Sequence, residues 1–261
     1  MDIQDPREIY NFIAANVDDP TIDTFVNNVQ VNVQDEEGGT ALHLAIRDDN
    51  TAVVKALLRC PLVDVNIEDI YGNTSFDYAL SASLEIFYSL IERPDLEIQK
   101  KDWHIVERSF IANPDDIDIA KLLNHPKFDI NHVGNNDITP LMYMVLHGSP
   151  SIVEKFLQLP NIDISKQSSK GNTVLHFAVA RTDIPNRSIE LLLSHPDIEI
   201  DAVNYEGHTP LFFAVAKNNK KAVNMLLFRK ADKTIVDHKG MHVIETTEDN
   251  KLIKILLGVV N

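Results

Sequence analysis

The sequence predicts an all-α solenoid, a row of stacked helix–turn–helix repeats that are linked by hairpin loops. Three observations lead to this fold class. Short segments that contain a threonine, and that usually end in an alanine, recur along the chain. Between them lies a second segment, such as Val54-Lys55-Ala56-Leu57-Leu58, with the apolar i, i+3, i+4 spacing of a helix that buries one face. A proline such as Pro61 follows, and it cannot continue the helix.

The spacing of the first segments gives the number of repeats. Steps of 34, 65, 34 and 36 residues separate Thr40, Thr74, Thr139, Thr173 and Thr209. The step of 65 spans two repeats, and Glu107 starts the missing one. A further step from Thr209 reaches His242. We therefore expect one domain over residues 1–261: a helical cap over 1–34, six repeats over 35–237 and a capping repeat over 238–261.

One helix pair of this size cannot bury its apolar face alone, so stacking must create a continuous core. We expect Leu192 to lie in that core. Each threonine can cap the first helix of its repeat, and Pro140 and Pro210 suit the first helical position. Small residues let the first helices approach closely; these are Ala45, Ala79, Ala112, Ala178 and Ala214.

The segments Gly39-Thr40-Ala41-Leu42-His43-Leu44-Ala45 and His208-Thr209-Pro210-Leu211-Phe212-Phe213-Ala214 resemble ankyrin repeats, whose motif is T-P-L-H-x-A with a period near 33. The resemblance covers residues 30 to 260. It implies a protein–protein interaction module whose partner docks on the hairpin tips and on the inner face of the first helices. It also implies that His43 and His176, which occupy the histidine position of the motif, brace the loop by hydrogen bonds.

Carried over by position, the candidate partner-binding residues lie at tips and inner helix ends. They are Tyr71, Trp103, His104, Tyr205, Arg47, His147, Arg181 and Lys217. Aromatic side chains supply much of the energy at interfaces. We therefore expect Tyr71, Trp103 and Tyr205 to line one contiguous surface. The alternative for Trp103 is burial, since its repeat departs furthest from the motif.

Composition indicates what kind of partner to expect. There are 39 Asp and Glu against 24 Lys and Arg, a net charge of −15, which disfavours nucleic acid and membrane surfaces and favours a basic protein surface. The alternative is that the charge only keeps an elongated protein soluble. We expect the chain to be a monomer. With the single Cys60, no apolar run of membrane-spanning length and no signal peptide, we expect a cytoplasmic protein.

The sequence contains no motif of a catalytic, nucleotide or metal site, so we expect no enzyme activity and no cofactor or metal. His125 and His195 each precede a proline, and the same position in the other repeats holds Cys60, Arg93, Leu159 and Arg229, a variety that predicts a solvated loop there. The acidic run Asp115-Asp116-Ile117-Asp118 is expected to open a second helix, where it complements the helix dipole.

Asn66 and Asn131 share a local pattern, with a leucine eight residues before and an aspartate two before. Repeats with this pattern resemble substrates of a eukaryotic asparaginyl hydroxylase. The alternative is that both asparagines only stabilise the hairpin.

For the chain as a whole we expect an adaptor, a scaffold or a bacterial effector in the host cytosol, because the Leu-Leu-x-His-Pro form of the repeat is similar to ankyrin proteins of intracellular bacteria and protists. The alternative is a regulatory or inhibitory subunit of an enzyme.

Overall fold

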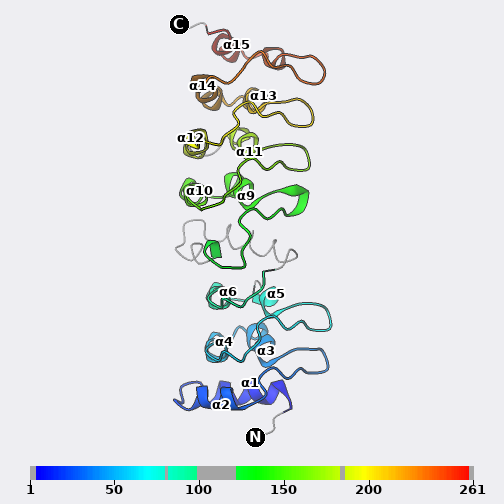
Figure 1. Ribbon diagram of the computed structural model, residues 1–261, viewed down its shortest axis with the longest axis vertical. Coiled ribbons are helices and arrows are strands. Elements are labelled where there is room, and N and C mark those ends of the chain that lie inside the picture. Colours follow the sequence, from blue (N-terminus) through cyan, green and yellow to red (C-terminus); the bar gives the residue numbers. More distant parts are fainter. Residues whose placement is uncertain (1–3, 80–81, 99–121, 183–185, 259–261) are drawn as a thin grey trace. The chain divides into compact units, whose positions relative to one another are not determined.

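The computed structural model describes residues 4–79, 82–98, 122–182 and 186–258. Trp103, His104, Glu107, Ala112 and the acidic run at 115–118 lie outside these ranges. The described residues form two compact units, the first over 4–98 and 122–128 and the second over 129–258. Both are built from helices (Figure 1), as predicted, and the only β-pairing recorded in the described ranges is two isolated bridges.

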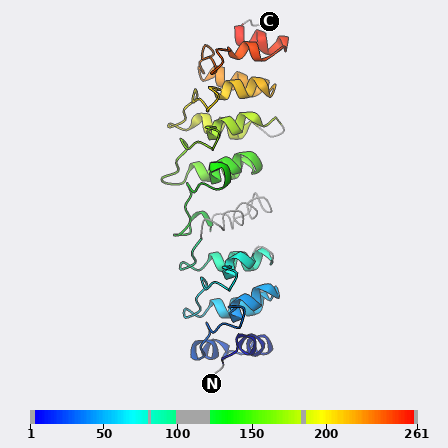
Figure 2. The same cartoon turned by 90° about the vertical axis from the view of Figure 1, so that its right-hand side faces the viewer.

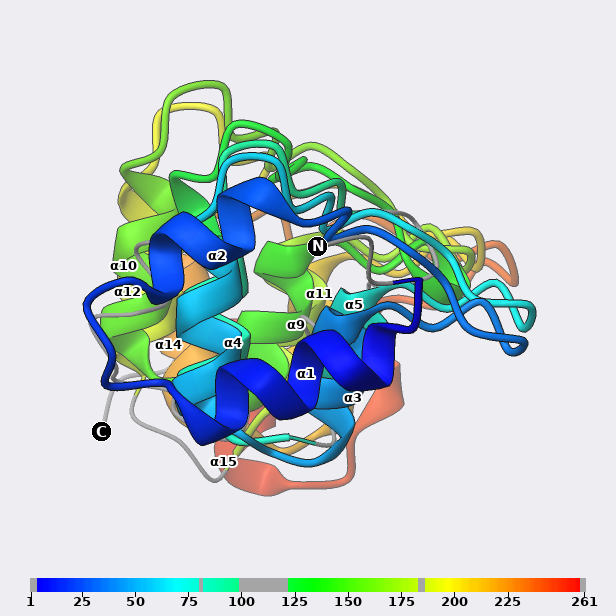
Figure 3. The same cartoon turned by 90° about the horizontal axis from the view of Figure 1, so that it is seen from below.

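The first unit contains three helix pairs. They are α1 (Pro6–Ala15) with α2 (Ile22–Asn28), α3 (Ala41–Arg47) with α4 (Thr51–Leu58), and α5 (Ser75–Ala79) with α6 (Leu84–Ile91). Helix α3 packs between α1 and α5, while α4 packs between α2 and α6. Figure 3 looks along this stack, with α1 over α3 and α2 over α4. Leu42, Leu57 and Phe76 are fully buried between the layers, so each helix pair completes its core with its neighbours.

The second unit repeats the arrangement. Its pairs are α9 (Pro140–His147) with α10 (Pro150–Leu157), α11 (Val174–Ala180) with α12 (Arg187–Ser194), α13 (Pro210–Ala216) with α14 (Lys220–Phe228), and η3 (Val243–Thr246) with α15 (Asn250–Leu257); the short turn η2 (Asn135–Asp137) precedes them. First helices pack on first helices and second on second, in successive layers (Figure 2). Leu192 is fully buried, as expected.

The first helices are short, so tertiary packing and capping hydrogen bonds must stabilise them, because helix propensity alone is insufficient. Thr40 and Thr139 act as predicted, because their side chains accept the N–H of His43 and Met142, 3.5 and 3.3 Å away. In the repeat that starts at Thr173, His176 Nδ1 accepts the main-chain N–H of Thr173 at 3.1 Å. The alanines at 45, 79, 178 and 214 are buried where these helices meet.

His176 also ties its repeat to the next. Its Nε2 lies 2.9 Å from the main-chain oxygen of His208, so Nε2 donates while Nδ1 accepts. Burial lowers the pKa of His176 to about 4, which keeps the ring neutral and preserves both bonds. His43 makes the corresponding bond to Thr40 N–H, at 3.2 Å. The bracing role expected for these two histidines is confirmed.

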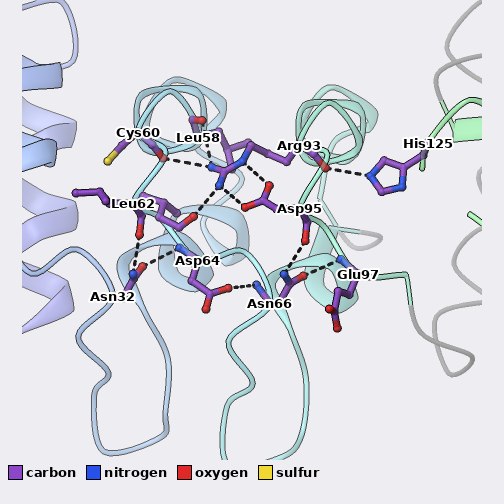
Figure 4. A network of polar contacts seen from close by, with 11 residues as sticks. Asn32, Leu58, Cys60, Leu62, Asp64, Asn66, Arg93, Asp95, Glu97 and His125 are labelled. Carbon is purple, nitrogen blue, oxygen red and sulfur yellow. Dashed lines mark hydrogen bonds and ion pairs between the residues drawn. The ribbon is translucent and has the colours of Figure 1, made fainter. Parts of the chain in front are cut away.

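The prediction of a solvated loop at the position that Cys60, Arg93 and His125 share is wrong for these three residues, whereas Arg229 is exposed as predicted. Cys60 and His125 are buried, and the Arg93 side chain is only 13% exposed. The carbonyl groups that end a second helix need donors. Arg93 supplies donors to such carbonyl groups, because its guanidinium lies 3.3 Å from the main-chain oxygens of Leu58 and Cys60 in the preceding repeat (Figure 4). His125 Nε2 in turn lies 3.0 Å from the oxygen of Arg93.

Candidate functional site

Five of the described hairpin tips are each built around one polar side chain, whereas the hairpin before Thr139 has Gly134 at that position. The side-chain oxygen accepts two main-chain N–H groups, two and four residues further on. In the first unit, Asp69 Oδ1 accepts from Tyr71 and Asn73, both at 2.9 Å. In the second, Asn204 Oδ1 accepts from Glu206 at 2.9 Å and from His208 at 3.0 Å. The same pair of bonds is made by Asp35, Ser168 and Asp237.

A glycine with positive φ follows, three residues after the polar one, and it allows the tight turn. The two residues between them therefore form the tip. These pairs are Glu36-Glu37 and Ile70-Tyr71 in the first unit, and Ser169-Lys170, Tyr205-Glu206 and His238-Lys239 in the second. Tyr71, Tyr205 and Ile70 are 68%, 65% and 64% exposed. Large apolar side chains are thus held in solvent on rigid turns.

Neighbouring tips are joined by main-chain hydrogen bonds. In the first unit, the N–H of Ile70 donates to the oxygen of Glu37 at 2.9 Å. In the second, Tyr205 N–H donates to Lys170 oxygen and His238 N–H to Glu206 oxygen, both at 3.1 Å. The tips of one unit therefore form a continuous edge. Within each unit this edge projects on the side away from the second helices (Figure 1).

On the inner side of the first unit, Arg47 lies at the end of α3 and its guanidinium is 3.7 Å from the Glu37 carboxylate. Arg47 also lies 6.0 Å from the ring centre of Tyr78, whose hydroxyl donates to Asp69 Oδ2 at 2.5 Å. Partial burial alone would raise the pKa of Asp69, but the hydrogen bonds from Tyr78, Asn73 and Tyr71 hold it below its ordinary value. Arg47 therefore belongs to the same surface as the tip.

In the second unit, His147 ends α9 and its ring lies 4.6 Å from that of Tyr143. Burial, and then the charge of Arg181, lower the pKa of His147. Arg181 ends α11, where its guanidinium donates to the oxygen of Val145 at 3.3 Å. These two inner-end residues lie close enough for the charge of Arg181 to disfavour protonation of His147.

Lys217 lines a pocket of about 410 Å³ in the second unit, between α13, the next hairpin and η3. Phe212, Phe213 and Met241 give it apolar walls. His208 stacks on Phe212 with ring centres 5.1 Å apart, and its Nε2 lies 3.4 Å from the buried Asp237 carboxylate. This pocket fits an apolar side chain next to a charged rim.

Tyr71 belongs to the first unit and Tyr205 to the second, while Trp103 and His104 lie outside the described residues. The contiguous surface expected for the three aromatic residues stays a prediction.

The two candidate hydroxylation residues link neighbouring repeats, and Figure 4 shows Asn66. Asn66 donates through Nδ2 to the oxygen of Asp95 and accepts the N–H of Glu97, both at 2.8 Å. Asn131, two repeats later, makes the same two bonds to Asn161 and Asp163, at 2.7 Å each. The structural role is therefore observed, and hydroxylation stays a prediction. Asn32 acts likewise, although the sequence analysis missed it; its spacing of eight residues before Thr40 was the available signal.

Within the described ranges, no three His, Cys, Asp or Glu residues are grouped in a way that could bind a metal ion. In the same ranges, no helix has the length and apolar character that crossing a membrane requires.

Comparison with known families agrees with this architecture. A family model described as ankyrin repeats, in three copies, matches residues 11–102, 110–201 and 141–237. These matches cover most of the chain. The chain belongs to the ankyrin-repeat family, whose repeats are generally protein–protein interaction modules.

Proposed function

We propose that this chain binds a partner protein with a basic surface through its hairpin tips and the inner ends of its first helices. The observation that carries this proposal is the tip of the first unit. There Ile70 and Tyr71 expose 64% and 68% of their surface on a turn that Asp69 fixes by two hydrogen bonds. A rigid exposed aromatic residue loses little conformational entropy on binding, so it makes an effective anchor.

The charge distribution supports a basic partner. Residues 1–128 contain 24 Asp and Glu against 10 Lys and Arg, a net charge of −14, whereas residues 129–261 contain 15 against 14, a net charge of −1. Glu36 and Glu37 form the tip beside Ile70 and are exposed. Such a negative surface speeds association with a positively charged partner, and added salt weakens this attraction.

The test is capture of partners from a eukaryotic lysate, followed by mass spectrometry. The wild type is compared with a Tyr71→Ala/Tyr205→Ala variant and with Glu36→Lys/Glu37→Lys. Partners that bind through the tips should be lost from both variants and should elute at moderate salt. A specific partner retained by both variants would contradict the proposal, provided that the thermal unfolding of each variant matches the wild type.

Within this binding role we propose an adaptor or scaffold in the cytoplasm, or a bacterial effector that acts in a host cytosol. The buried, hydrogen-bonded Cys60 is compatible with a reducing compartment. The alternative role is a regulatory or inhibitory subunit of an enzyme. The purified partner decides between them: an enzyme whose activity changes on adding the chain supports the alternative, and a partner without activity supports the adaptor.

A further inference from the structure

One residue of α14 breaks the pattern of the second helices. The residue after the paired apolar positions is polar in five other repeats, as Arg59, Glu92, Asn124, Gln158 and Ser194, and it is Gly258 after α15. In α14 the pair is Leu226-Leu227, the next residue is Phe228, and it is 86% exposed. An exposed phenylalanine at a position that is otherwise polar breaks a local rule, and such departures are enriched at functional surfaces.

Phe228 borders a groove between α12 and α14, with a volume of about 530 Å³. We call it the outer groove; Glu190, Leu193, Ser194, Asn224, Met225 and Arg229 line it with Phe228. The side chain of Leu193 is buried, whereas that of Met225 is half-buried, so Met225 and Phe228 provide the accessible apolar surface of the groove. The charge of Glu190 is already matched by Arg187, 3.3 Å away.

The surroundings of Phe228 are positively charged. Arg229, Lys230 and Lys221 are exposed, and no carboxylate of the described residues lies within 4.0 Å of any of them. Residues 210–258, which include α14 but not α12, contain nine Lys and Arg against five Asp and Glu, a net charge of +4 in a chain whose net charge is −15. The α14 side of the groove is therefore positively charged.

Arg229 differs from its counterpart Arg93, which is folded onto the preceding repeat. The residue after Arg93 is Pro94, whereas Lys230 follows Arg229 and turns the chain with a φ of 63°. Arg229 is exposed and lines the outer groove. Its guanidinium is thus available to a ligand, beside the apolar surface that Phe228 provides.

We propose that the outer groove binds an acidic protein segment that carries one large apolar side chain. The apolar side chain packs on Phe228 and Met225, and carboxylates beside it pair with Arg229 and Lys230. In the second unit, α12 and α14 lie away from the hairpin loops (Figure 1), so this surface is separate from the one in the proposed function. Its partner also has the opposite charge, which makes the chain a two-sided connector.

An array of short synthetic peptides tests the proposal. The central residue is Phe, Leu or Ala, and the flanking residues are Glu, Ser or Lys. Purified full-length chain should bind the Glu-flanked Phe and Leu peptides most tightly, and binding should weaken steeply with salt. Phe228→Gln should lower this affinity at least about tenfold, and Arg229→Glu/Lys230→Glu should abolish it.

Phe228→Gln keeps the fold, because Phe228 is exposed and Gln158 occupies the same position in another repeat. Tyr205→Ala is the matched control, and it should not change peptide binding. The proposal is overturned if the Lys-flanked peptides bind best, if no peptide depends on Phe228, or if the residue instead mediates self-association or binding to phosphatidylserine vesicles. Loss of partner capture in the tip variants, with peptide binding intact, separates this result from the proposed function.

Discussion

The side-chain amide of Asn131 donates a hydrogen bond to the main-chain oxygen of Asn161, 2.7 Å away in the next repeat. The oxygen of the same amide accepts the N–H of Asp163, also at 2.7 Å. One side chain thus satisfies two main-chain groups that no helix or strand satisfies, and it fixes the spacing of two repeats. Asn32 and Asn66 do the same in the first unit.

Asn131→Ala removes both of these bonds. It should lower the free energy of unfolding by about 1–3 kcal/mol. Ser165 occupies the corresponding position one repeat later but bonds only to Asp163 of its own repeat, so Ser165→Ala is the control and should cost less than half as much. Urea denaturation of the two variants measures the difference, and equal losses would show that the link between repeats contributes nothing.

Hydroxylation is tested on the same residues. The hypothesis predicts that incubation with a eukaryotic asparaginyl hydroxylase adds one oxygen atom at Asn66 and one at Asn131, as measured by intact mass and peptide mapping. Asn66→Gln/Asn131→Gln should gain none. An unchanged mass of the wild type would leave these asparagines with their structural role alone.

Leu192 is fully buried in α12, where the layers of the second unit meet. Leu192→Ala should leave a cavity and lower the free energy of unfolding by about 2–5 kcal/mol. Leu257, at the end of α15, is exposed, and Leu257→Ala should change stability by no more than about 0.5 kcal/mol. A Leu192 variant as stable as the Leu257 variant would mean that the repeats do not share a continuous core.

Glycine at the hairpin tips can be needed for two reasons: the left-handed backbone of the turn, and the close approach of the next tip. Gly207 and Gly240 differ in the second. Both have positive φ, of 82° and 79°, but a Cβ on Gly207 would lie 2.7 Å from the main-chain nitrogen of His238, whereas one on Gly240 would have nothing within 4 Å. Gly240→Ala should cost about 1–2 kcal/mol for the left-handed backbone alone. Gly207→Ala should cost more, because the two tips must also move apart. Equal losses in denaturation would mean that the close approach of the tips has no energetic importance.

His176 predicts a pH dependence of stability. Its pKa is lowered to about 4 in the fold, chiefly by burial, and lies near 6.5 when the chain is unfolded. Between these values the unfolded chain binds a proton that the folded chain does not, so stability that is present above pH 6.5 is lost as the pH falls towards 4. The loss is at most about 3 kcal/mol. The stability difference between wild type and His176→Gln should therefore shrink between about pH 7 and pH 5, and a constant difference would contradict this role.

The sequence predicted the repeat spacing, the caps at Thr40 and Thr139 and the exposed tip at Tyr71, because each depends on residues close together in the chain. It did not predict the burial of Arg93 or His125. Their partners are carbonyl groups about thirty residues away, in the preceding repeat, and a variable position gives no sign of them. The outer groove was missed for a similar reason, since Phe228 stands out only when its repeat is aligned with the others and its exposure is known.

Hydrogen exchange of the chain, measured with and without a captured partner protein, tests the central claim most directly. The account predicts slower exchange at the tips, in peptides that contain residues 36–38, 70–72 and 205–207, and unchanged exchange in α4, α6 and α10. Protection confined to these second helices, with the tips unaffected, would contradict it.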